Sequence, residues 1–75
     1  MARRLLAVRP RQIIRALEKA EFVIEHQTDS HVIMRHPSSR RKVAIPRHNR
    51  DVRRGLMFAI IQQAGLSPEE FAELL

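Results

Sequence analysis

Four histidines are the side chains of this sequence best suited to move protons near neutral pH, because a free imidazole titrates at about 6.5. Their spacings of five, five and twelve residues match no metal-site pattern, so we expect no bound metal. Each could also be a plain surface residue. They are His26, His31, His36 and His48.

His31 stands between a turn signal and an apolar run, in the stretch T-D-S-H-V-I-M (28–34). Strand alternation predicts Val32 and Met34 on one face and His31 on the other. Ser30 comes directly before His31, and neighbouring strand residues point to opposite sides, which argues against a Ser–His dyad. His31 is therefore either a solvated strand-end residue or a group that transfers protons.

Eight cations fall within residues 35–54 and are opposed there only by Asp51, in a chain whose formal net charge is +6. An excess concentrated in one region favours a polyanion such as nucleic acid, or an acidic protein surface. A soluble surface alone requires neither one sign nor one region. The eight are Arg35, Arg40, Arg41, Lys42, Arg47, Arg50, Arg53 and Arg54.

A histidine that transfers protons, together with cations that stabilise charge on a phosphate, is the set of groups that a metal-free ribonuclease requires. RNA carries its own nucleophile, the 2′-hydroxyl, which must lose a proton while charge builds on phosphorus and the leaving oxygen gains a proton. Trp and Tyr are absent and the three Phe are expected in the core, so phosphate contacts should outweigh base stacking. A non-catalytic RNA-binding domain and a module for an acidic protein remain alternatives.

Length and composition exclude other classes of protein. A chain of 75 residues is expected to form a single domain that buries about 60% of its unfolded surface, which leaves little room for a cofactor. The absence of cysteine excludes disulfides and thiolate sites. The basic N-terminal segment 1–9 has too short an apolar run for a secretory signal, and nothing later could span a bilayer, so we expect a cytoplasmic protein.

Hydrophobic periodicity indicates the elements that position these residues. It predicts an amphipathic helix over 10–20, three antiparallel strands over 22–27, 31–36 and 40–45, and a helix from Met57 to Ala64. Pro46 is expected to end the third strand and Gly65 the helix. Within 22–27, simple alternation places Phe22, Ile24 and His26 on one face.

The residues S-P-E-E (67–70) predict a capping box that opens a short C-terminal helix. The resulting order, α-β-β-β-α with this added helix, is that of a two-layer α+β domain. A three-stranded antiparallel sheet would have helices on one face only. His31, Arg35 and Lys42 would then lie on the open face.

Five segments in this order are A-E-F-V (20–23), S-H-V-I-M-R-H-P (30–37), V-A-I-P-R-H-N (43–49), R-R-G (53–55) and I-I-Q-Q-A-G-L-S-P-E-E-F (60–71). Together they resemble the HicA-type toxins, small mRNA interferases that pair with HicB antitoxins. The resemblance covers about residues 9–75. It implies a fold like that of double-stranded-RNA-binding domains, cleavage of mRNA without a cofactor, and a HicB-like antitoxin that covers the active site.

The resemblance also implies that His31 is catalytic, because it takes the place of the histidine in the family's Gly-Ser-His element. Asp29 and Glu21 stand where glycine is usual, and Leu56 where threonine is usual. We interpret Asp29 as a turn residue that tolerates the left-handed conformation, or alternatively as a carboxylate that orients or charges His31. The residues expected to contact RNA are Ser30, Arg35, Arg40, Arg41, Lys42, Arg47, His48, Arg50, Arg53 and Arg54.

Overall fold

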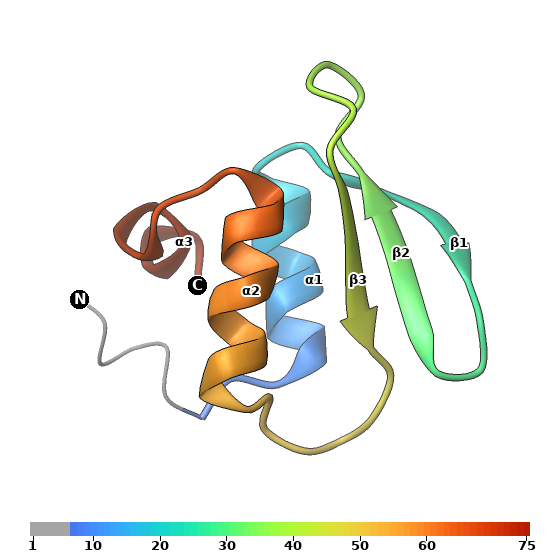
Figure 1. Cartoon of the computed structure of the whole chain (residues 1–75), viewed down its shortest axis with the longest axis vertical. Helices are drawn as coiled ribbons and strands as arrows, with labels where there is room; N and C mark the ends of the chain where they lie inside the picture. Colours follow the sequence, from blue (N-terminus) through green and yellow to red (C-terminus); the bar gives the residue numbers. More distant parts are fainter. Residues whose placement is uncertain (1–6) are drawn as a thin grey trace.

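A computed structural model describes residues 7–75, and residues 1–6 of the expected basic segment lie outside that range. The α+β order predicted from the sequence is confirmed (Figure 1). The elements along the chain are α1 (Pro10–Lys19), β1 (Val23–Gln27), β2 (His31–Arg35), β3 (Lys42–Pro46), α2 (Arg54–Ala64) and α3 (Pro68–Leu74).

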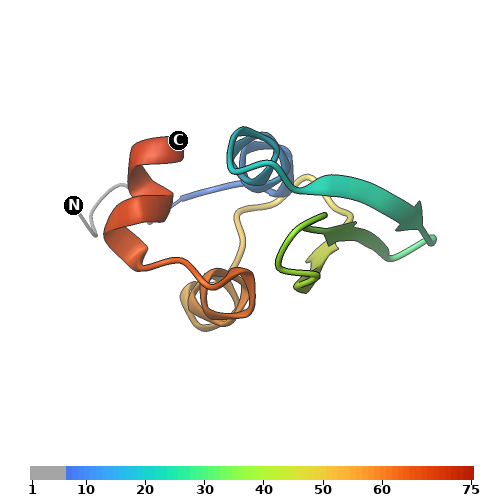
Figure 2. The same cartoon turned by 90° about the horizontal axis from the view of Figure 1, so that it is seen from above.

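The three strands form one antiparallel sheet in the order β1-β2-β3, as the short turns between them predicted. Helices α1 and α2 cover one face of this sheet and leave the other face open. The short helix α3 packs against α1 and α2 on the side away from the sheet, which Figure 2 shows from above.

The core lies between the sheet and the two long helices. Alternate residues of β2 and β3 are buried, and the register sets Val32 opposite Ile45 and Met34 opposite Val43. This confirms the predicted inner face of both strands. The apolar positions at helical spacing that meet this face are Ile13, Ala16 and Leu17 from α1, and Met57, Ile60 and Ile61 from α2.

Strand β1 departs from simple alternation. Its register shifts between Ile24 and His26, so that Glu25 is an extra residue, a β-bulge. Cross-strand partners share a face, and His26 is paired with Ile33, whose neighbours in β2 are buried on the opposite face. His26 therefore lies on the open face. The predicted alternation holds as far as Ile24 and was wrong for His26 and Gln27, because a bulge depends on pairing across strands.

The third strand begins later than predicted. Arg40 has φ 65°, a left-handed conformation, and its backbone N–H donates to the carbonyl of His36 at 2.9 Å. It therefore belongs to the turn of the β2–β3 hairpin, and the strand starts at Lys42. At its other end β3 includes Pro46, which is paired with His31 at the last ladder position, after which the strand stops as expected.

Local signals predicted the end of α2 and the start of α3 correctly. Helix α2 begins at Arg54 and not at the predicted Met57, because its first residues are exposed and lie outside the apolar repeat. Gly65 has φ 77° and closes α2 in the left-handed conformation. Ser67 opens α3 by accepting a 3.0 Å hydrogen bond from the Glu70 N–H, while the Glu70 carboxylate accepts a 2.7 Å bond from the Ser67 N–H. This is the predicted capping box, which satisfies two N–H groups at the start of the helix.

Two residues that stand where the resemblance expects glycine differ in backbone conformation. Glu21 has φ 73°, so a left-handed residue follows α1 and glycine would fit there without a steric cost. Asp29 is not among the non-glycine residues with positive φ in the range 7–75. Asp29 therefore lies in the turn between β1 and β2, as predicted, without adopting the left-handed conformation.

The two glycines give opposite predictions when each is replaced by alanine. Gly65→Ala should lower the free energy of unfolding by about 1–2 kcal/mol, because a Cβ is disfavoured at this φ. That Cβ would also lie 2.6 Å from the Arg41 Nε, which must move. Gly55→Ala should raise the free energy of unfolding by about 0.5–1 kcal/mol, because Gly55 is helical and a Cβ there meets nothing within 4 Å.

Urea unfolding followed by circular dichroism measures both changes. Effects of the same sign for Gly65→Ala and Gly55→Ala would contradict this account of the two helix ends.

Candidate active site

His31 is the first residue of β2, and its side chain is exposed on the open face of the sheet. Its backbone is held from both sides by Thr28. The Thr28 hydroxyl accepts a 2.9 Å hydrogen bond from the His31 N–H, and the Thr28 N–H donates to the His31 carbonyl at 2.8 Å. The buried Val32 follows directly, so the imidazole stands on a backbone anchored by the turn and by the core.

The ring of His31 contacts Ser30, with 3.2 Å between Nδ1 and the Ser30 Oγ. The sequence argument that separated these side chains was wrong, since Ser30 belongs to the turn and strand alternation starts only at His31. Within residues 7–75, Asp29 forms no hydrogen bond or ion pair with His31. The hydroxyl of Ser30 therefore orients the ring, and Nε2 forms no hydrogen bond within residues 7–75.

Arg47 ties the loop after β3 to the turn before β2. Its backbone N–H donates to the Ser30 carbonyl at 2.9 Å, and its Nη1 donates to the Thr28 carbonyl at 2.6 Å. In the same loop, the Nδ1 of His48 accepts a hydrogen bond from the Arg50 N–H at 3.1 Å. This loop and His31 are thereby fixed at the same end of the sheet.

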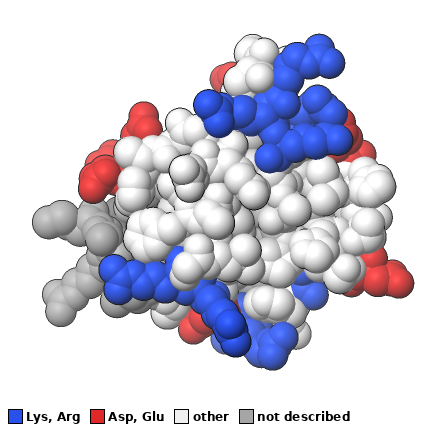
Figure 3. Space-filling model, in the orientation of Figure 1, with Lys and Arg blue, Asp and Glu red and all other residues white. Residues whose placement is uncertain are grey.

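The eight cations that fall close together in the sequence, within residues 35–54, lie at the two opposite ends of β3. The five residues of β3 separate its ends by about 13 Å. Figure 3 shows lysines and arginines gathered mainly at opposite ends of one face, with uncharged surface between them. We call Arg35, Arg40, Arg41 and Lys42 the hairpin group, and Arg47, Arg50, Arg53 and Arg54 the loop group. His31 lies at the end of the sheet where the loop group is found, since it pairs with Pro46.

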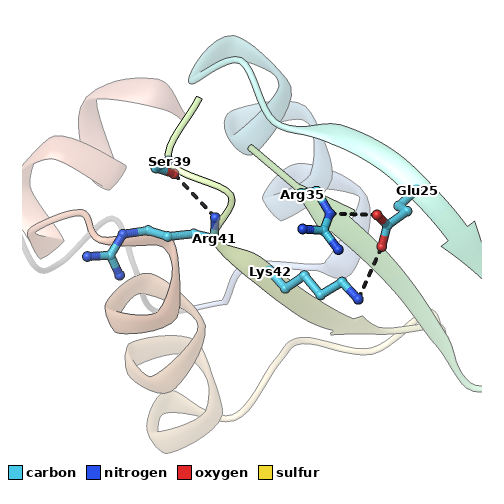
Figure 4. Close-up of polar contacts among 5 residues, drawn as sticks. All are labelled: Glu25, Arg35, Ser39, Arg41 and Lys42. Atoms are coloured by element: carbon cyan, nitrogen blue, oxygen red, sulfur yellow. Dashed lines mark hydrogen bonds and ion pairs between the residues drawn. The ribbon is translucent and has the colours of Figure 1, made fainter. Parts of the chain in front are cut away.

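Glu25, which the sequence reasoning did not single out, binds two cations of the hairpin group (Figure 4). Its Oε2 lies 2.6 Å from the Arg35 Nε and its Oε1 lies 3.4 Å from the Lys42 Nζ. The hydrogen bond from Arg35, with a smaller contribution from Lys42, lowers the pKa of the Glu25 carboxyl. The bulge brings this carboxylate onto the open face, so no pattern along the strand could have revealed the contact.

Arg41 of the hairpin group is held by two hydrogen bonds. Its backbone N–H donates to the Ser39 hydroxyl at 3.3 Å (Figure 4). Its Nη1 donates to the Gln63 carbonyl of α2 at 3.4 Å. His36 accepts hydrogen bonds at Nδ1 from the Ser38 and Ser39 N–H groups, both at 3.1 Å. His36 therefore stabilises the hairpin turn.

A groove of about 750 Å³ borders the His31 end of the sheet on the helix side. Arg11 and Arg15 of α1 line it together with Arg47 and His48 of the loop. The sequence analysis did not include Arg11 and Arg15, because a basic residue on the polar face of a helix is usually only solvated. Their i, i+4 spacing, which places both on one face, was the available signal.

Two further findings concern ligands and membranes. Among residues 7–75, no group of three or more His, Asp or Glu side chains is arranged to hold a metal ion. Over the same range, none of the helices has the length and apolar character needed to cross a bilayer.

The Glu25 contacts predict a measurable pKa. An NMR titration should find the Glu25 carboxyl below the ordinary glutamate range, and Arg35→Met should raise its pKa toward that range. Because the pKa is lowered in the folded state, the stabilisation is present above the unfolded pKa and is lost as the pH falls through the folded one. Arg40→Met, which removes a hairpin cation outside this contact, is the control. An equal rise with Arg40→Met would contradict the direct pairing.

The sequence matches the model of a known protein family. The family model described as HicA toxin of bacterial toxin–antitoxin matches residues 10–66, a stretch that includes α1, the whole sheet, α2 and the surroundings of His31. No curated protein matches the chain. Since the matched residues make up more than half of the sequence, the chain belongs to the HicA toxin family of bacterial toxin–antitoxin systems.

Proposed function

We propose that this HicA-family protein is a metal-independent endoribonuclease, an mRNA interferase, in which His31 transfers the proton. The observation that supports this most directly is the contact between the His31 Nδ1 and the Ser30 Oγ at 3.2 Å. It orients an exposed imidazole at the end of a strand and leaves Nε2 for substrate. Family membership supports the toxin role and the choice of RNA as target.

The reaction follows from the chemistry of RNA. With the Nδ1–H of His31 donating to the Ser30 hydroxyl, the lone pair at Nε2 takes the proton of the 2′-hydroxyl. The 2′-oxygen bonds to phosphorus and the bond from phosphorus to the 5′-oxygen breaks. The leaving 5′-oxygen takes a proton, either the one now held at Nε2 or one from water. The products are a 2′,3′-cyclic phosphate and a 5′-hydroxyl. DNA, which has no 2′-hydroxyl, would not be cleaved by this route.

Charge that develops on the phosphate would be stabilised by cations at the same end of the sheet. At that end, Arg47 is held by the Thr28 carbonyl, and Arg50 and His48 lie in the same loop. Arg53 and Arg54 follow at the start of α2. The hairpin group would contact more distant nucleotides of a longer RNA.

The partner would be a HicB-like antitoxin, for which an acidic surface would complement the net charge of +6.

An RNA cleavage assay in the presence of a chelator tests the proposal. His31→Ala should lower the cleavage rate by about 10²–10⁴-fold, the usual contribution of a general base or acid. His26→Ala is the matched control, since it removes an exposed imidazole from the same face of the sheet. It should cleave at the wild-type rate.

Other outcomes separate the alternatives. Equal cleavage by the wild type and His31→Ala would refute the catalytic role of His31. Salt-dependent binding of RNA without cleavage would instead favour a non-catalytic RNA-binding domain. Neither binding nor cleavage would favour a basic module for an acidic protein.

A further inference from the structure

The groove beside α1 lies at the same end of the sheet as His31, on the face that the helices cover. Three of its lining residues are neighbours of that histidine: Asp29 lies two positions before it, Val32 follows it, and Pro46 is paired with it across the ladder. The other wall is the first half of α1. A ligand bound at His31 would therefore reach this groove by passing around the end of the sheet.

The groove has an apolar floor and a cationic rim. Pro10 and Val32, both buried, form the floor together with the partly buried Ile14. Exposed arginines from α1 and from the loop after β3 stand around it. This arrangement suits a nucleotide, whose base can lie on apolar side chains while its phosphate faces the arginines. The imidazole of His48 is the aromatic ring that the groove offers for stacking, and no Phe, Tyr or Trp of residues 7–75 lines it, so contacts to the RNA backbone would dominate over base preference.

Arg11 and Arg15 are the free cations of this rim. They are exposed, and across residues 7–75 neither forms an ion pair. Arg9, by contrast, lies 3.7 Å from Asp51. Residues spaced i, i+4 on a helix have Cβ atoms about 5–6 Å apart, so these two guanidinium groups can contact successive phosphates of one strand.

We propose that this groove binds the single-stranded RNA that flanks the cleaved phosphodiester, with Arg11 and Arg15 contacting its phosphates. The inference rests on the proposed function, because it takes His31 as the cleavage point, and it adds a substrate-binding subsite formed by α1. A flexible single strand fits this role, since attack by the 2′-oxygen requires it to align with the bond that breaks.

Asp29 acts against this binding. Its carboxylate lines the same groove and would repel a phosphate there. Removal of this charge should therefore strengthen RNA binding, a gain that a damaged or unfolded variant could not produce.

The test measures binding without cleavage. The fluorescence anisotropy of a labelled single-stranded RNA of about 10 nucleotides is followed at several salt concentrations in a His31→Ala background. The double variant Arg11→Gln/Arg15→Gln should bind about tenfold more weakly. The slope of the logarithm of its binding constant against the logarithm of the salt concentration should be smaller in magnitude by about 1.4. The charge-preserving Arg11→Lys/Arg15→Lys should retain most of the affinity.

Asp29→Asn should bind the same RNA about threefold more tightly. Glu18→Gln is its matched control, because it removes one negative charge from an exposed position of α1 that does not line the groove. Circular dichroism verifies that each variant is folded.

Unchanged affinity in the Gln double variant, or equal tightening by Asp29→Asn and Glu18→Gln, would overturn the groove proposal. Absence of RNA binding at low salt would overturn it as well and point to an acidic protein as occupant. The proposed function fails separately: a wild-type protein that binds RNA through the groove but does not cleave it would refute the ribonuclease alone.

Discussion

The pairing register of β2 with β3 is the constraint on which the rest of the structure depends. It places Val32 beside Ile45 on the face that the helices cover. A shift by one residue would turn these buried side chains to solvent, so the core fixes the register. The same ladder sets His31 opposite Pro46 and lets the Arg47 N–H reach the turn before β2. The site is therefore positioned by the packing of a small core.

Much of this architecture could be predicted from local patterns. The alternation around Met34 and the apolar spacing around Ile60 each report a face that must be buried, and both are confirmed. Gly65 and the Ser67 capping box are equally local, because each is required by the backbone of its own helix end. These local signals predict the structure correctly because the tertiary packing of this protein requires the same helix ends and the same buried faces.

Contacts between distant segments could not be predicted in this way. The bulge at Glu25 arises from pairing across two strands, and it both moves His26 to the open face and neutralises charge near Arg35. The cations of residues 35–54 form two separate groups in space, because β3 lies between them. The approach of Arg11 to the His31 end depends on how α1 crosses the sheet. Net charge indicated the class of partner but not the surface that would bind it.

The central claim is that RNA is bound at the His31 end of the sheet. A ¹H–¹⁵N NMR titration of His31→Ala protein with a short single-stranded RNA tests it most directly, because each backbone amide reports on its own surroundings. The account predicts shifts concentrated at residues 11–15, 28–32 and 46–50. Shifts confined to the hairpin turn at 36–42, with the His31 end unchanged, would contradict it.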